Sequence, residues 1–325
     1  MRSKIEIGNA EEIVTSSLHW RRRVGSQRDW VWRGWQTRYT YIRSQHAKEA
    51  PPLMLLHGFG ASIGHWRQNL SALSERHTVY ALDMLGFGAS EKAIAPYNVA
   101  LWVEQVYDFW KTFIREPIVL IGNSIGSLVC MAAAATHPDM VRGLVMLNLP
   151  DPSIEEEMIP EPLRPVVATI KSWVASPLVL NLLFQFVRKP GGVKRWASIA
   201  YANSDAVTDE LVEILLGAAE DRGSTRAFCA IFRAIVAPKF GPSAKKTLPQ
   251  LQMPMLLLWG KNDRMIPLSL AAQFGSYNSN LKVVEIENAG HCLHDEAPEQ
   301  VNPEILNWIA SWSGNSEEAS LSPML

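Results

Sequence analysis

One serine, flanked by two glycines, is the strongest candidate for nucleophilic chemistry in this sequence. The apolar run 118–121 predicts a buried strand, and the alanine-rich run 128–135 predicts a helix shortly after it. Between them, Gly122-x-Ser124-x-Gly126 is the nucleophile-elbow pattern, in which a sharp strand-to-helix turn exposes the serine hydroxyl. The glycines permit the close approach that this turn requires, and we expect the serine in a strained conformation at a helix N-terminus. The pattern therefore predicts that Ser124 is a nucleophile.

Two further side chains are needed to activate such a serine. The hydroxyl is a poor nucleophile until an imidazole accepts its proton, and the imidazole needs a carboxylate to orient it. Asp263 follows the predicted strand 253–259, and His291 follows the predicted strand 281–287. The chain order Ser124, Asp263, His291 matches that of serine hydrolases built on parallel sheets. These three residues are the predicted catalytic triad.

Other residues compete for two of these roles. Of the eight histidines, only His291 combines a preceding glycine with a position just after the last predicted strand. Asp151 follows the predicted strand 142–148, where some hydrolases carry the acid, and it is the alternative to Asp263. Asp83 also follows a predicted strand, but we expect it to hold its own loop.

A glycine-rich turn early in the chain supplies the remaining part of an acyl-transfer site. The apolar run 53–56 predicts a strand buried on both faces, and His57-Gly58-Phe59-Gly60 follows it directly. A turn of this type directs a backbone N–H at the oxyanion that forms when an acyl carbon is attacked. The predicted oxyanion hole consists of the N–H groups of Phe59 and Ile125.

The elements that must position these residues follow a strand–helix alternation. Such a rhythm between residues 53 and 148 predicts βαβ units, and so an α/β fold with a mostly parallel central sheet flanked by helices. Residues 29–35 and 37–43 alternate apolar and polar side chains, which predicts an antiparallel pair at a sheet edge. Helical spacing predicts a helix over 99–115, and 304–312 lies in a closing helix.

The chain divides into an arm, a core in two parts and an inserted cap. Residues 1–27 form a predicted N-terminal arm, and residues 28–149 and 252–315 form the predicted core. Residues 150–251 contain many prolines and no convincing strand pattern, which predicts a helical cap inserted before the strand of Asp263. Within the cap, the apolar run 173–187 is suited to packing on the core, to lining an apolar tunnel or to contact with a membrane.

Composition excludes several classes of function. With 325 residues and 47% hydrophobic content the chain can bury a large core, and a formal net charge of −1 offers no attraction for nucleic acid. The start of the sequence lacks the apolar segment of a signal peptide, and no apolar run is long enough to span a membrane. The cysteines are too widely spaced for a metal or disulfide framework and fit a reducing compartment: Cys130, Cys229 and Cys292.

The motifs of this sequence resemble those of the α/β-hydrolase superfamily over nearly the whole chain. Within it, the sequence is most similar to the branch that includes pheophytinase and chlorophyll dephytylase, although that branch usually has glycine where Ser127 follows the elbow. The resemblance implies a helical cap on an α/β-hydrolase core and hydrolysis of the ester that joins an isoprenoid alcohol to a chlorophyll-like tetrapyrrole. The start of the sequence and the cysteine usage predict a protein that is not secreted and is cytoplasmic, and the resemblance adds a thylakoid-associated location as the alternative. The stretches that carry it are residues 30–34, 57–62, 65–67, 79–83, 85–88, 90–92, 122–126 and 290–292.

Two classes of function remain open from the sequence. A serine esterase of this kind needs no metal or organic cofactor, and the same triad also serves lipid hydrolases, small-ester hydrolases and carbon–carbon bond hydrolases. A serine at the elbow disfavours dehalogenases and epoxide hydrolases, which use aspartate there. The other class is a ligand-binding receptor with a vestigial triad. Peripheral membrane contact would involve the cap or the basic segment 20–23 of the arm, although for this segment we favour a solvated surface.

Overall fold

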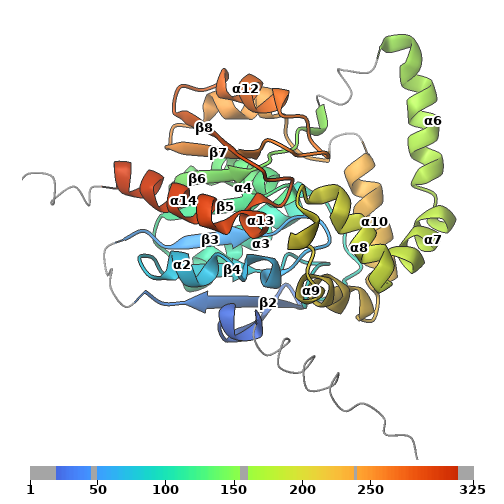
Figure 1. Cartoon of the computed structure of the whole chain (residues 1–325), viewed down its shortest axis with the longest axis horizontal. Helices are drawn as coiled ribbons and strands as arrows, with labels where there is room; N and C mark the ends of the chain where they lie inside the picture. Colours follow the sequence, from blue (N-terminus) through green and yellow to red (C-terminus); the bar gives the residue numbers. More distant parts are fainter. Residues whose placement is uncertain (1–19, 45–49, 154–159, 238–239, 314–325) are drawn as a thin grey trace, which may run out of the picture.

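The computed structural model describes residues 20–44, 50–153, 160–237 and 240–313, and its centre is one eight-stranded sheet (Figure 1). Its strands are β1 Gln27–Trp32, β2 Trp35–Ile42, β3 Leu53–Leu56, β4 Val79–Leu82, β5 Ile118–Asn123, β6 Val141–Leu147, β7 Met255–Gly260 and β8 Leu281–Ile286. They lie in the order β1-β2-β4-β3-β5-β6-β7-β8. β2 pairs antiparallel with β1 and β4, and all other neighbours are parallel. The predicted mostly parallel sheet and its antiparallel edge pair are confirmed.

Helices cover both faces of the sheet (Figure 1). One core contains side chains of α3 (Val99–Phe113), α4 (Ile125–Thr136) and α12 (Ser269–Gly275), and the other those of α2 (Leu70–Ser74), α13 (Leu293–Glu296) and α14 (Pro298–Trp312). Within β3, Met54 and Leu56 enter the first core, and Leu53 and Leu55 enter the second, because successive strand side chains point to opposite faces. Burial on both faces explains why the central strands are apolar throughout. Short 3₁₀ segments are η1 Ile63–Trp66, η2 Pro138–Met140, η3 Glu161–Leu163, η4 Ser204–Ala206 and η5 Leu248–Gln250.

Between β6 and β7 the chain is helical, and its described part contains no strand. Figure 1 places α8, α9 and α10 beside one end of the sheet, whereas α6 projects away from the body of the protein. The apolar run 173–187 does not form one continuous helix. A new helix, α7, begins at Pro177, because proline suits the first turn of a helix but not its interior. The helices are α6 Arg164–Val174, α7 Pro177–Val187, α8 Pro190–Ala200, α9 Asp209–Glu220, α10 Ser224–Val236 and α11 Ala244–Thr247.

Two buried cations join these helices to the core. Lys92 Nζ donates to the Gly88 and Ser90 carbonyl oxygens at 2.6 and 2.9 Å and pairs with Asp221 Oδ2 at 2.9 Å. Arg67 pairs with Asp295 of α13 at 2.7 Å and with Glu210 of α9 at 2.9 Å. Both cations are nearly inaccessible to solvent. Removal of Asp221 would therefore leave Lys92 without a carboxylate partner, whereas removal of Asp295 would leave Arg67 with Glu210 alone.

The expectation of a loosely attached arm up to residue 27 is wrong for residues 20–27. Residues 20–23 are helical, and the side chains of Trp20 and Val24 are buried against the core. Trp20 Nε1 donates to Glu213 Oε1 at 3.3 Å, and Arg23 forms an ion pair with Glu210. Part of the basic segment considered for membrane attachment is therefore engaged with α9, while residues 1–19 lie outside the described part.

Three observations bear on the functions considered from composition. No helix within the described ranges is both long and apolar enough to cross a bilayer. Within the same ranges no group of histidine, cysteine and carboxylate side chains is arranged to hold a metal ion. The three cysteines are free thiols, and burial raises the pKa of each of them: Cys130, Cys229 and Cys292.

Candidate active site

Ser124 stands at the turn between β5 and α4 with an unusual backbone. Its φ and ψ are 55° and −119°, which is a strained combination for a residue with a side chain. It also occupies the N-cap position of α4, where unpaired N–H groups favour negative charge. The strained elbow expected from the sequence is confirmed.

The two elbow glycines are required by contact distances. A Cβ atom at Gly122 would lie 2.3 Å from the carbonyl carbon of Gly126. A Cβ atom at Gly126 would lie 2.2 Å from the carbonyl oxygen of Leu56 on the neighbouring strand. Both distances are far below van der Waals contact with backbone atoms that cannot move aside, so the turn forms only with glycine at these positions.

Ser127, which stands where the resembled branch usually has glycine, has a structural role. Its Oγ lies 2.7 Å from Gly122 O and 2.9 Å from Leu147 O, and it accepts a hydrogen bond from Leu147 N at 2.9 Å. The hydroxyl is fully buried and ties α4 to the ends of β5 and β6. A serine therefore fits this position without altering the elbow.

Asp263 and His291 lie together at the ends of β7 and β8. Asp263 Oδ2 is 2.8 Å from His291 Nδ1, so the carboxylate orients the ring with Nε2 left for another partner. The second oxygen, Oδ1, accepts hydrogen bonds from Met265 N at 2.7 Å and Ile266 N at 3.0 Å. These bonds fix the carboxylate, and the Asp263 side chain is fully buried.

Asp151, the alternative acid, is engaged elsewhere. Its Oδ1 accepts hydrogen bonds from the backbone N and Oγ of Ser153 at 2.9 and 2.6 Å, and its Oδ2 accepts one from Ala244 N at 2.8 Å. These contacts join the end of β6 to α11, and no hydrogen bond links Asp151 to His291 among the described residues. The geometry favours Asp263 as the partner of the imidazole.

Two asparagines that the sequence analysis did not single out hold the loop that carries His291. Asn123 Nδ2 donates to His291 O at 3.0 Å. Asn148 Nδ2 donates to Gly290 O at 3.0 Å, and its Oδ1 accepts a hydrogen bond from Gly260 N at the same distance. Asn123 is the last residue of β5 and Asn148 directly follows β6, and a polar residue at the end of a mainly apolar strand was the signal that could have identified them.

The cap also contacts the histidine loop through its backbone. His291 N donates to Ala200 O, at the end of α8, at 2.7 Å. Glu296 bridges the two parts, since its carboxylate accepts hydrogen bonds from Gly290 N at 2.7 Å and from Asn203 N at 2.5 Å. A Cβ atom at Gly290 would lie 2.5 Å from Ala200 O, which explains the glycine before the histidine. The position of the imidazole thus depends on both core and cap.

The predicted oxyanion donors flank the serine from two loops. Ile125 N is the first amide of α4, where helix geometry leaves the N–H without an intrahelical partner. Phe59 lies in the turn after β3, and its ring packs against Phe87, Phe228 and Phe232. Among the described residues the Phe59 N–H has no backbone hydrogen-bond acceptor, so it is available to a substrate oxygen.

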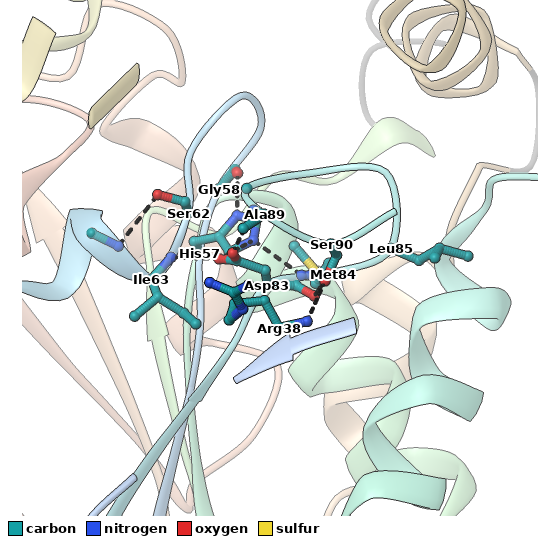
Figure 2. Close-up of polar contacts among 12 residues, drawn as sticks. Arg38, His57, Gly58, Ser62, Ile63, Asp83, Met84, Leu85, Ala89 and Ser90 are labelled. Carbon is teal, nitrogen blue, oxygen red and sulfur yellow. Dashed lines mark hydrogen bonds and ion pairs between the residues drawn. The ribbon is translucent and has the colours of Figure 1, made fainter. Parts of the chain in front are cut away.

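The turn after β3 is held by a network that Figure 2 shows in detail. His57 Nε2 accepts a hydrogen bond from Met84 N at 3.1 Å, so the ring is neutral, with its proton on Nδ1, which donates to Gly58 O at 2.8 Å. Burial lowers the pKa of His57, in agreement with this neutral state. Asp83 accepts hydrogen bonds from Ile63 N and Ala89 N at 2.6 and 2.7 Å. The expectation that Asp83 holds its loop is confirmed.

Two pockets meet at the serine, and the residues shared by both are Ser124, Phe59, Trp196, Met265 and His291. The α7–α8 pocket measures about 150 Å³, and its other side chains are mainly apolar, among them Leu183, Phe184, Val187, Val193 and Phe228. The α10–α11 pocket measures about 510 Å³ and combines apolar with polar side chains, among them Ile125, Leu128, Asp151, Phe232, Phe240 and Lys246. A ligand with two different ends can therefore extend from Ser124 in two directions.

Comparison with known proteins places this arrangement in a family. Residues 51–298 match the family model of the α/β hydrolase fold. Chloroplastic pheophytinase of Arabidopsis thaliana is 25% identical over 310 residues, which cover 83% of this chain but only 63% of that protein. Epoxide hydrolase 3 of Xenopus tropicalis is 25% identical over 282 residues, which cover 84% of this chain and 74% of that protein. The 2-hydroxymuconate semialdehyde hydrolase of Pseudomonas sp. strain CF600 is 28% identical over 249 residues, which cover 74% of this chain and 80% of that protein.

Solved structures show the same architecture. A membrane phospholipase A, described as a bacterial virulence factor, superposes with a TM-score of 0.73 at 25% identity and covers 93% of this chain and 91% of its own. A serine hydrolase of carbazole degradation superposes with a TM-score of 0.72 at 21% identity and covers 88% of this chain and 99% of its own. Because the family model matches most of the sequence, and strand order and elbow agree with it, this chain belongs to the α/β-hydrolase fold family.

Proposed function

We propose that this protein is a serine hydrolase that cleaves a carboxylic ester through an acyl-enzyme. The observation that carries the proposal is the hydrogen bond between Asp263 and His291 beside pockets that Ser124 also lines. Membership of the α/β-hydrolase fold family, and similarity to an epoxide hydrolase and to 2-hydroxymuconate semialdehyde hydrolase, support an enzymatic role. A serine at the elbow favours an acyl ester over the alkyl ester that epoxide hydrolysis requires.

Each residue has a defined part in this reaction. Ser124 Oγ attacks the ester carbonyl carbon while His291 Nε2 accepts the hydroxyl proton, and Asp263 stabilises the imidazolium that results. The N–H groups of Phe59 and Ile125 bind the oxyanion of the tetrahedral intermediate. The intermediate then collapses, the alcohol leaves with the proton from His291, and the acyl group stays on Ser124. A water molecule, deprotonated by His291, attacks the acyl-enzyme and releases the acid.

For the substrate we propose an ester of a long apolar alcohol, with a phytyl ester of a chlorophyll-like pigment as the first choice. The mainly apolar side chains of the α7–α8 pocket, which measures about 150 Å³, support binding of the part of such an alcohol next to the ester. The larger α10–α11 pocket, with polar side chains at Ser153, Ser243 and Lys246, supports binding of a bulkier acid. Similarity to pheophytinase supports the pigment, at 25% identity.

Hydrolysis of a carbon–carbon bond is the second candidate, with lipid and small-ester hydrolysis as further uses of the same triad. Similarity to 2-hydroxymuconate semialdehyde hydrolase and the polar part of the α10–α11 pocket favour the carbon–carbon reaction. A receptor with an inactive triad is the remaining alternative. The short hydrogen bond between Asp263 and His291 favours an enzyme over a receptor, because binding alone does not require an oriented base.

The proposal includes a location. A pigment with an apolar tail dissolves in membranes, so we propose that the protein works in peripheral contact with a lipid surface, thylakoid or cytoplasmic. The pheophytinase relative is named as chloroplastic, and the phospholipase neighbour as a membrane protein.

The test is chromatographic. Purified protein and its Ser124→Ala variant are incubated with detergent-dispersed chlorophyll a and pheophytin a, and the pigments are separated from their dephytylated products. Product from the wild type alone is the expected result. A serine-directed fluorophosphonate probe is applied in parallel.

Each outcome selects among the candidates. Labelling of Ser124 without any dephytylated product would keep the hydrolase and reject the pigment. Absence of both product and labelling would favour the receptor. Equal product from wild type and Ser124→Ala would reject Ser124 as the nucleophile.

A further inference from the structure

The exposed large apolar side chains of the described residues are unevenly distributed. Most of them lie between residues 163 and 199, on or beside helices α6, α7 and α8. We use the term docking face for six of these side chains, which are Trp173, Leu178, Leu182, Phe186, Trp196 and Ile199. Scattered single residues of this kind are normal on a protein surface, but a concentration on neighbouring helices marks a surface that contacts another apolar body.

Helix α7 is apolar except for Asn181 and Gln185, which lie on its exposed side. Leu180 and Phe184 are buried, yet Leu178 and Leu182, on other positions of the same helix, are 71% and 62% exposed. A helix that is apolar all round is normally enclosed by protein or by lipid. Here the protein encloses only one side, because α7 contacts α6, α8 and α10 and none of the sheet strands extensively. Something outside the described chain is needed to cover the rest.

The charges on the same segment indicate what this partner is. Residues 176–200 contain no aspartate or glutamate, but they contain four cations, Arg188, Lys189, Lys194 and Arg195. Lys194 pairs with Asp209 of α9, while Lys189 and Arg195 are exposed. In a chain with a formal net charge of −1, this is a local excess of positive charge beside an apolar surface. Cations next to exposed apolar side chains characterise helices that lie in the interface of an anionic membrane.

The docking face is directly connected to the site. On α7, Leu183, Phe184 and Val187 line the α7–α8 pocket, whereas Leu182 and Phe186 point to the outside. Trp196 of α8 belongs to both, since it lines the pocket and is 39% exposed. Only one layer of helices therefore separates the exterior at this face from the pocket beside Ser124.

We propose that the docking face inserts into the headgroup region of an anionic lipid bilayer and that an apolar ester passes from the bilayer between α7 and α8 to Ser124. The route of the ester rests on the proposed function, whereas attachment to the bilayer does not. A second copy of this chain is a less suitable occupant, because a symmetric contact would bring the cations of α7 and α8 close to those of the partner.

The experiment is co-flotation of the full chain with vesicles of phosphatidylcholine alone or mixed with phosphatidylglycerol. The wild type is expected to float with the mixed vesicles. The triple variant Leu178→Ser/Leu182→Ser/Phe186→Ser should lose at least about tenfold in partition coefficient, because three apolar side chains leave the interface. The matched control is Val31→Ser/Ile94→Ser, which alters two exposed apolar residues outside the cap and should bind as the wild type does.

A charge variant tests the preference for anionic lipid. Lys189→Gln/Arg195→Gln should bind the mixed vesicles several-fold more weakly and no better than vesicles of phosphatidylcholine alone. Unchanged binding of the triple variant would overturn the proposal. The proposal would also be overturned if the wild type does not float but forms a dimer in analytical ultracentrifugation, and the triple variant is a monomer.

Hydrolysis of a soluble ester tests the proposed function independently of bilayer attachment by the docking face. With p-nitrophenyl butyrate, the triple variant should be as active as the wild type, because none of its three residues lines either pocket. With an apolar ester carried in mixed vesicles, the same variant should lose about tenfold in rate. Flotation of a wild type that hydrolyses no ester would reject the proposed function and leave the docking face intact.

Discussion

The side-chain amide of Asn123 donates to the carbonyl oxygen of His291 at 3.0 Å. Asn123 directly precedes Ser124, so this bond connects the residue next to the proposed nucleophile with the backbone of the proposed base, 168 positions later in the chain. Asn148 repeats the arrangement one strand further along, with a bond to Gly290 O at 3.0 Å. The sheet thereby holds the histidine loop against the elbow, and this contact can be tested separately from the triad.

Removal of the Asn123 amide should lower kcat more than removal of an equally buried amide away from the pockets. In Asn123→Ala the buried His291 carbonyl loses its donor, which we expect to cost about 1–3 kcal/mol in the free energy of unfolding. Displacement of the imidazole should lower kcat roughly 10- to 100-fold with a smaller effect on KM. The variant is measured by urea denaturation and by steady-state kinetics with a soluble ester.

Asn302→Ala is the matched control for Asn123→Ala. Asn302 is also buried, and it accepts a hydrogen bond from Asn69 Nδ2 at 2.7 Å and donates to Gln68 O at 3.0 Å, away from the pockets. We expect a similar loss of stability with kcat preserved. Equal losses of kcat in both variants would mean that Asn123 acts only through stability.

The two candidate acids predict opposite phenotypes. Asp263→Asn keeps the shape of the side chain but removes the charge that stabilises the imidazolium, so kcat should fall roughly 10³- to 10⁴-fold. Asp151→Asn should stay within a few-fold of the wild type, since Asp151 binds Ser153 and Ala244 rather than His291. Pre-steady-state acylation with a chromogenic ester measures both. A large loss of the acylation rate in Asp151→Asn alone would mean that Asp151, and not Asp263, is the acid of the triad.

The elbow should not tolerate a methyl group. Gly126→Ala places a Cβ 2.2 Å from Leu56 O, which we expect to cost about 3 kcal/mol or more in stability. Gly217→Ala is the control, because an added Cβ there meets nothing within 4 Å in the exposed interior of α9. It should stabilise the protein by about 0.5–1 kcal/mol. Thermal denaturation followed by circular dichroism distinguishes the two, and a stable Gly126→Ala protein would contradict the elbow geometry.

Stability should decrease as the pH falls below about 6.5, and His294 should contribute to this. Burial, with Arg67 nearby, lowers the pKa of His294 from its usual 6.5 to about 3. Below pH 6.5 the unfolded chain therefore binds a proton that the folded chain does not, so the free energy of unfolding declines until the pH approaches 3. One such group contributes a slope of about 1.4 kcal/mol per pH unit.

His294→Gln isolates this contribution. The variant cannot bind the proton, so between pH 6 and pH 5 its slope should be smaller than that of the wild type by about 1.4 kcal/mol per unit. The remaining slope includes the contributions of His57, His65 and His77, whose pKa values burial also lowers. It is opposed by Asp83, Asp295 and Glu296, because burial raises the pKa of each of these carboxyl groups and the folded chain then binds the extra proton. Urea denaturation at a series of pH values measures the slopes, and identical slopes would show that His294 is not buried in its neutral form.

The sequence by itself was sufficient for the features that depend on neighbouring residues. Strands buried on both faces must be apolar, so Leu53–Leu56 and Ile118–Asn123 were recognisable as core strands. The turn around Ser124 must have glycine at fixed positions, so the elbow was recognisable from its spacing. The ends of parallel strands meet at one edge, which was enough to name Asp263 and His291 as a pair.

Only the tertiary structure decided the contacts between distant segments. The sequence predicted Asp263 as the acid and kept Asp151 as the alternative. The contacts that distinguish them, Asp263 with His291 and Asp151 with Ala244, are found only in the tertiary structure. Residues 20–27 were wrongly expected to be loose, because Trp20 is buried by packing against the core and by a bond to Glu213, 193 positions away. The cap is the clearest case, since an apolar helix has the same sequence signature whether protein or lipid covers it. Only the arrangement of α7 in space shows that the described residues leave Leu178 and Leu182 largely exposed.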